Sequence, residues 1–138
     1  MLIDSRLEFS DSQALTATAV STNVVDLGSD RDIGPGRSLY LVLSVDVAAD
    51  GANGNETYAV ALQSDDDAGF GSPSALVSRS FAAAELAKGS QPVIPLPLAN
   101  ERYLRLSYTL GGTSPSVTLS AWLTDQEPRS WRALPGER

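Results

Sequence analysis

Residues 38–47, SLYLVLSVDV, decide the fold of this chain. Every second residue from Leu39 to Val47 is Leu or Val, and the residues between them are Tyr, Val, Ser and Asp. Side chains that alternate with a period of two lie on opposite faces of a β-strand. The stretch therefore predicts a strand with one face in a hydrophobic core.

Two later stretches repeat the alternation: residues 102–110 (RYLRLSYTL) and residues 116–124 (SVTLSAWLT). In the second, Ala121 and Leu123 belong to the apolar side, so Trp122 is expected to point outward. The residues between the stretches, GGTSP, are typical of turns. We therefore expect the two strands to pair as a β-hairpin.

Weaker strand patterns occur elsewhere, and one stretch is typical of a helix. Pro92, Pro95 and Pro97 cannot donate hydrogen bonds to a neighbouring strand, so their segment is expected at a sheet edge or in an extended arm. Residues 81–88 (FAAAELAK) have helical propensity before Gly89, and predict a short helix or a turn. The weaker strands are predicted at residues 14–20, 23–27, 57–63, 75–79 and 92–98.

About eight short strands and at most one short helix indicate an all-β fold, a two-sheet antiparallel sandwich of the jelly-roll type. A chain of 138 residues with eleven Gly and eight Pro suits one such domain. We place the sandwich domain at residues 1–125 and a C-terminal docking arm at residues 126–138.

The composition argues against several classes of function. The chain contains no His and no Cys, which are the usual residues for proton transfer near neutral pH, for nucleophilic thiols and for zinc sites. Its net charge of -7 would repel nucleic acid and anionic lipid. The first ten residues lack the order of a signal peptide, and no apolar run is long enough to span a bilayer. We expect no catalytic residues, no cofactor, and synthesis in the cytoplasm.

Two polar loops are candidate cation sites. Asp65, Asp66 and Asp67 follow a predicted strand, and their carboxylates could bind a hard cation such as calcium. Residues 50–56 (DGANGNE) offer oxygen donors at intervals, but Asn-Gly is foremost a turn sequence. Neither loop has the ligand spacing of an EF-hand. We favour solvated turns, assign no metal ligands, and leave cation binding at the first loop open.

Sugar chemistry is the other alternative to a purely structural role. Two carboxylates can hydrolyse a glycosidic bond, but no Glu lies on the inward side of a clear strand. A sugar-binding surface is more plausible, because an outward Trp122 beside Tyr103 or Tyr40 could stack on a sugar ring. We favour the interpretation that these aromatic residues cover the sheet or lie in a protein interface.

The segment 126–138 (QEPRSWRALPGER) has no strand pattern, yet it carries Trp131 between Arg129 and Arg132. Trp and Arg are enriched among the residues that dominate binding energy in protein interfaces. The segment is interpreted either as an arm that docks on a partner or as a tail that packs back on its own sandwich through Trp131.

The order of motifs resembles the jelly-roll capsid cement proteins of tailed bacteriophages, the group typified by a Bordetella phage. The resemblance covers nearly the full chain, and the motifs that carry it follow one another in register. They are MLIDSRLEFSDSQALTATAVSTNVVDLG, RDIGPGRSLYLVLSVD, YAVALQSDDDAGFGSP, PLPL, RYLRLSYTLGG and the terminal W-R-A-x-P. The chain departs from the family pattern in loops, notably at residues 50–56.

This resemblance implies a homodimer on the outer surface of an icosahedral head, where it bridges major capsid protein subunits of the HK97-like type. The protein is then expected in the virion, and in the host cytoplasm during assembly. The alternative is a carbohydrate- or receptor-binding module of a phage tail. Six residues are the candidate contacts to the capsid or to a second copy: Trp131, Arg129, Arg132, Trp122, Pro95 and Pro97.

Overall fold

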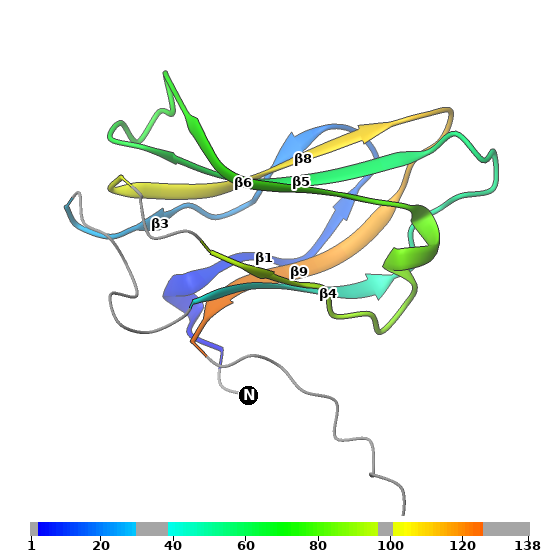
Figure 1. Ribbon diagram of the computed structural model, residues 1–138, viewed down its shortest axis with the longest axis horizontal. Coiled ribbons are helices and arrows are strands. Elements are labelled where there is room, and N and C mark those ends of the chain that lie inside the picture. The colour runs from blue at the N-terminus through cyan, green and yellow to red at the C-terminus, as the bar shows by residue number, and fades with distance from the viewer. Residues whose placement is uncertain (1–2, 30–38, 97–100, 126–138) are drawn as a thin grey trace, which may run out of the picture.

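The computed structural model describes residues 3–29, 39–96 and 101–125, which form two antiparallel sheets packed face to face (Figure 1). The four-stranded sheet contains, in spatial order, β1 (Glu8–Leu15), β9 (Val117–Thr124), β4 (Tyr40–Val47) and β7 (Val93–Pro95). The five-stranded sheet contains β2 (Ala19–Val20), β8 (Tyr103–Gly111), β5 (Thr57–Asp65) and β6 (Ser74–Phe81), with β3 (Val25–Asp26) also paired to β8.

This strand order is that of a jelly roll. The chain crosses repeatedly between the sheets, so that the first strand, β1, lies beside the last, β9, and β4 lies on the other side of β9. Two Greek keys wound together produce this arrangement. The predicted fold class, an all-β jelly-roll sandwich, is confirmed.

The core fills the space between the sheets with the alternating side chains that the sequence pattern predicts. Tyr108 lies in this core, and its hydroxyl group is 2.7 Å from the Ser10 hydroxyl of the opposite sheet. Burial raises the pKa of Tyr108 far above its usual value. Hydrogen bonding therefore joins the two sheets across an otherwise apolar layer, which includes Phe9, Leu41, Leu43, Leu62, Leu104, Leu106, Leu119 and Leu123.

The first strand begins earlier in the sequence than predicted and is one residue longer. A strand over residues 14–20 is wrong, because β1 runs from Glu8 to Leu15 and only Ala19 and Val20 form the separate strand β2. Two register shifts interrupt the pairing of β1 with β9, and Ser12 has a positive φ of 46°. Such irregularities break the period of two, so the sequence pattern does not reveal this strand.

The predicted hairpin between residues 102–110 and 116–124 is also wrong. Both strands exist, as β8 and β9, but they belong to different sheets. Gly112 has a φ of 99°, and a Cβ atom there would lie 2.6 Å from the Asn55 carbonyl oxygen. The glycine turn therefore lets the chain pass close to a neighbouring loop on its way between the sheets, instead of reversing it within one sheet.

The other predicted strands are present, with small changes at their ends, wherever the structure describes their residues. β7 pairs only with β4 and so lies at a sheet edge, as its prolines predict. The helical stretch 81–88 contains a single 3-10 turn, η2 (Ala83–Leu86), and a second, η1 (Ser5–Leu7), precedes β1. No helical segment among the described residues has the length and hydropathy of a membrane span. β9 ends at Thr124, and the predicted arm at 126–138 lies outside the described residues.

Candidate functional site

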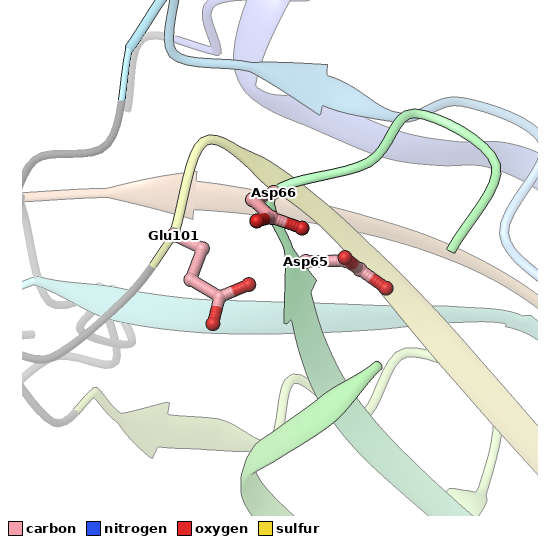
Figure 2. Close-up of side chains that lie close together, drawn as sticks. All are labelled: Asp65, Asp66 and Glu101. Atoms are coloured by element: carbon pink, nitrogen blue, oxygen red, sulfur yellow. The ribbon is translucent and has the colours of Figure 1, made fainter. Parts of the chain in front are cut away.

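Three carboxylates meet at the end of β5, where the first candidate cation loop begins. One carboxylate oxygen from each of Asp65, Asp66 and Glu101 lies within 4.8 Å of the others. Figure 2 shows the three side chains, two from the end of β5 and one from the segment that leads into β8. The acidic run in the sequence groups Asp65 and Asp66 with Asp67, whereas the structure brings Glu101 to them, which no local spacing indicates.

The Asp65 carboxylate is held by the backbone of its own loop. Its two oxygens accept hydrogen bonds from the backbone N–H groups of Asp67, at 3.0 Å, and Ser72, at 2.9 Å. These bonds hold the pKa of Asp65 below its usual range. Asp67 in turn accepts from the Gly69 N–H at 3.1 Å. These two carboxylates therefore organise the loop, and Asp65 is itself buried.

Phe70 anchors the same loop on the five-stranded sheet. Its φ is 52°, an uncommon conformation for a bulky residue, and its ring is buried. The guanidinium group of Arg105, on the outer face of β8, lies 4.3 Å from the ring centroid. Arg105 also donates to the side-chain oxygen of Gln63 at 2.8 Å. The cation–π contact between Arg105 and Phe70 thus fastens the loop to β8, and the hydrogen bond to Gln63 in β5 holds Arg105 in place.

The second candidate cation loop, residues 50–56, is built around the Tyr58 hydroxyl group. This hydroxyl donates to the Asp50 carbonyl oxygen at 2.6 Å and accepts from the Ser116 N–H at 3.1 Å. The Asp50 carboxylate accepts from the Ala52 N–H, and one Glu56 carboxylate oxygen accepts from the Asn53 N–H at 3.1 Å. The side chains of Asp50 and Glu56 therefore hold the backbone of the turn through hydrogen bonds within the loop.

Trp122 lies on the outer face of the four-stranded sheet, as its place in the alternation predicts, but it is not exposed. It pairs across the sheet with Val42 on one side and Glu8 on the other. Only 4% of Trp122 and 0% of Val42 is accessible, although neither belongs to the core between the sheets. The outward direction of Trp122 is as predicted, but its burial leaves no exposed ring for a sugar, because alternation predicts the face of a side chain and not whether that face is covered.

The outer face of this sheet is divided into two parts. Tyr40, Val42 and Trp122 form an apolar part. At the other end, the Asp46 carboxylate accepts hydrogen bonds from the hydroxyl groups of Ser12, at 2.9 Å, and Ser120, at 3.1 Å. This network ties three strands together on the side that faces away from the core.

The aromatic residues proposed for a sugar platform do not come together. Tyr103 is in β8 of the five-stranded sheet, where the guanidinium group of Arg102 lies 4.9 Å from its ring centroid. Trp122 is in the other sheet and is buried. Tyr40 shares a face with Trp122, but it is half-buried. The described residues therefore form no exposed ring surface that includes Trp122.

Of the six candidate contact residues, the structure describes two. Pro95 is exposed on the edge strand β7, and Trp122 is buried on the outer face of its sheet. The other four, Pro97, Arg129, Trp131 and Arg132, lie outside the described residues, so their contact role stays a prediction.

Comparison with known proteins identifies the family of the chain. No curated protein matches it at the level of whole sequences. The model of one protein family, Bbp16, matches residues 9–123, which extend from the start of β1 to the end of β9. The match includes almost every described strand residue, and it agrees with the family suggested by the sequence motifs. The chain belongs to the Bbp16 family, the capsid cement proteins named after Bordetella phage protein 16.

Proposed function

We propose that this protein is a capsid cement protein that binds the outside of an icosahedral phage head and bridges neighbouring major capsid protein subunits of the HK97-like type. The family match over residues 9–123 carries the proposal, because it spans the jelly roll from β1 to β9. The work is structural and requires no catalytic group. The site of action is the outer surface of the virion.

The physical character of the domain suits such a clamp. Hydrogen bonding joins the two sheets through Ser10 and Tyr108, so a load applied to one sheet is transmitted to the other. The net charge of -7 also keeps the protein from binding the genome during packaging. A rigid, negatively charged domain of this kind can stabilise a shell through many contacts with capsid subunits and needs no catalytic group.

The direct test mixes the purified protein with heads of its phage that lack it. We expect the protein to sediment with these heads at a fixed ratio to the major capsid protein, and to raise the temperature at which the shell opens. Fully decorated heads are the control and should take up none. Failure to bind undecorated heads, combined with binding to a glycan array, would instead support the tail-module alternative.

We further propose that the protein acts as a homodimer on the capsid. Pro95 and the half-buried Val93 provide apolar surface along the β7 edge. Sedimentation equilibrium at rising protein concentration should show a dimer, and density on decorated heads should show paired copies. Monomers in both measurements would contradict this proposal.

The segment 126–138 is proposed as the arm that anchors the protein to the shell, with Trp131 filling an apolar pocket and Arg129 and Arg132 pairing with carboxylates. Because β9 ends at Thr124, a chain that ends at Asp125 keeps every described strand. It should melt close to the full-length chain and fail to decorate heads, as should Trp131→Ala. Normal decoration by both would show that the arm is dispensable, and early melting would place Trp131 in the domain's own core.

A further inference from the structure

The edges of the two sheets differ in how well they are protected. An edge strand has unpaired backbone N–H and C=O groups along one side, and proteins usually shorten, bend or block such strands to prevent further pairing. The described strands form four edges. They are β1 and β7 in the four-stranded sheet, and β6 and the short strands β2 and β3 in the five-stranded sheet.

Three of these edges are obstructed. β1 contains two register shifts, and its Phe9 carbonyl oxygen accepts from the Asn23 N–H at 2.9 Å. β7 is three residues long and ends at Pro95. β2 and β3 are two residues long each. A further strand could not pair with any of these edges over a useful length.

The fourth edge, β6, is open. It is eight residues long, has no internal proline, and pairs with β5 from Phe81 opposite Tyr58 to Ser74 opposite Ser64, with one register shift. Within the described part of the chain, its backbone hydrogen bonds go only to β5. At about 3.3 Å per residue, it offers roughly 26 Å of free edge.

The side chains of β6 also suit an added strand. Ser78 and Ser80 are small and exposed, so they would not obstruct a neighbour. Arg79 is the only charged residue of the strand and lies over the Phe81 ring at 4.8 Å. It forms no ion pair with a described carboxylate. In a chain with a net charge of -7, this strand therefore offers an isolated positive charge to a partner.

We propose that β6 is a docking strand, to which an extended segment of the capsid partner adds as the next strand of the sheet and places a carboxylate beside Arg79. Strand addition takes its affinity from backbone hydrogen bonds and its selectivity from such side-chain pairs. The inference rests on the proposed function, since it names the surface by which the cement protein holds the shell.

A second copy fits this edge less well than a foreign strand. Two β6 strands related by a twofold axis run antiparallel, which brings the start of each beside the end of the other. The acidic residues Asp66 and Asp67 precede β6, and Glu85 follows it, so carboxylates would approach carboxylates. The charge pattern favours a partner segment that supplies the negative charge itself.

Proline substitution on β6 tests the proposal, because neighbouring residues of a strand direct their N–H groups to opposite sides. Of Ser78→Pro and Arg79→Pro, one loses a hydrogen bond to β5 and the other loses only a free donor. The variant that melts within a few degrees of the unsubstituted protein is the informative one. Its control, Ser78→Ala or Arg79→Ala at the same position, keeps the backbone N–H group.

We expect the informative proline variant to bind undecorated heads about tenfold or more weakly, beyond the effect of its alanine control. Arg79→Glu should weaken binding more than Arg79→Lys does.

Undiminished binding by the proline variant would overturn the inference while the cement function stands, because the unsubstituted protein would still bind. If the unsubstituted protein does not bind heads, both proposals fail. If the proline variant loses dimerisation in sedimentation but keeps binding, the occupant of β6 is a second copy and the inference is wrong.

Hydrogen exchange gives a second measurement that needs no variant. The free amides of β6 should exchange more slowly on decorated heads than in the isolated protein, while amides of the short strand β2 should change little. Equal exchange rates of β6 amides in both states would overturn the proposal even if both proline variants failed to fold.

Discussion

The outer faces of the two sheets differ sharply in what they carry. On the four-stranded sheet, Trp122 and Val42 are large, apolar and buried. On the five-stranded sheet, the outward positions along the middle of β5, β6 and β8 carry small residues that are half-buried or exposed, namely Ala59, Ala61, Ser78, Ser80, Ser107 and Thr109. The side chains of both faces alternate with core side chains, and Phe70 covers the second face at the end near Arg105. Along the middle of the strands only the first face carries buried apolar side chains, so we expect the stability of the domain to depend more on that face.

The largest effect is expected for Trp122→Ala. Removing a buried Trp side chain leaves a cavity and should lower the free energy of unfolding by about 3–5 kcal/mol, measured by chemical denaturation. The matched variant on the opposite face, Thr109→Ala, should change it by no more than about 0.5 kcal/mol. Equal effects of the two variants would remove the distinction between the faces.

Tyr108→Phe tests how firmly the two sheets are joined. The variant keeps the ring and removes only the hydroxyl that lies 2.7 Å from the Ser10 hydroxyl, so unfolding should become easier by about 1–2 kcal/mol. Tyr40→Phe is the control, because the Tyr40 hydroxyl makes no hydrogen bond to a described residue. A cost no larger than that of the control would show that this hydrogen bond adds nothing measurable to the joining of the sheets.

Asp65→Asn weakens the loop that is fastened to the five-stranded sheet. The carboxylate accepts two backbone hydrogen bonds, and these hold the pKa of Asp65 below its usual range. The ionised group therefore stabilises the fold at pH values above the unfolded-state pKa, and this contribution is lost as the pH falls through the lower folded-state pKa. Melting curves should show the variant less stable at pH 7, with the gap to the unsubstituted protein closing on acidification. A gap that does not depend on pH would contradict the assignment.

The smallest effect is expected for Ala61→Ser on the outer face of the five-stranded sheet. Ala61 pairs with Ser78 and Ser107 and lies outside the core, so the free energy of unfolding should change by less than about 0.5 kcal/mol. Thermal melting would check this. A large loss would mean that this face is as tightly packed as the face of Trp122.

The regular strands could be predicted from the sequence because their burial follows a period of two. Residues 38–47 and 102–110 became β4 and β8, and the turn signals between strands indicated the jelly roll. The pattern failed where the backbone is irregular, as in β1, whose register shifts and positive φ at Ser12 displace the alternation. It also failed to predict which strand pairs with β8. The glycine turn after β8 is compatible with a hairpin and with a crossover to the other sheet, and distant strands decide between them.

The candidate sites were less predictable. The sequence identified the acidic loop, but Glu101 joins Asp65 and Asp66 through the fold and not through spacing. Trp122 was assigned to the correct face, but its burial depends on what lies over that face. The open edge of β6 could not be predicted either, because it depends on the order of the strands in the sheet, which places β5 on one side of β6 and no described strand on the other.

The position of β9 has a consequence for how the molecule is made. Among the described strands, β9 is the last in sequence, yet it lies between β1 and β4 and is the only one that pairs with β1. A growing chain that has already released β1 and β4 therefore holds two strands with no partner between them until β9 emerges. Contacts so distant in sequence slow folding, typically to milliseconds or seconds. β4 can pair with β7 before β9 emerges, but β1 can join the four-stranded sheet only after β9 does, so we expect β1 to stay unpaired late in synthesis and to be exposed to aggregation.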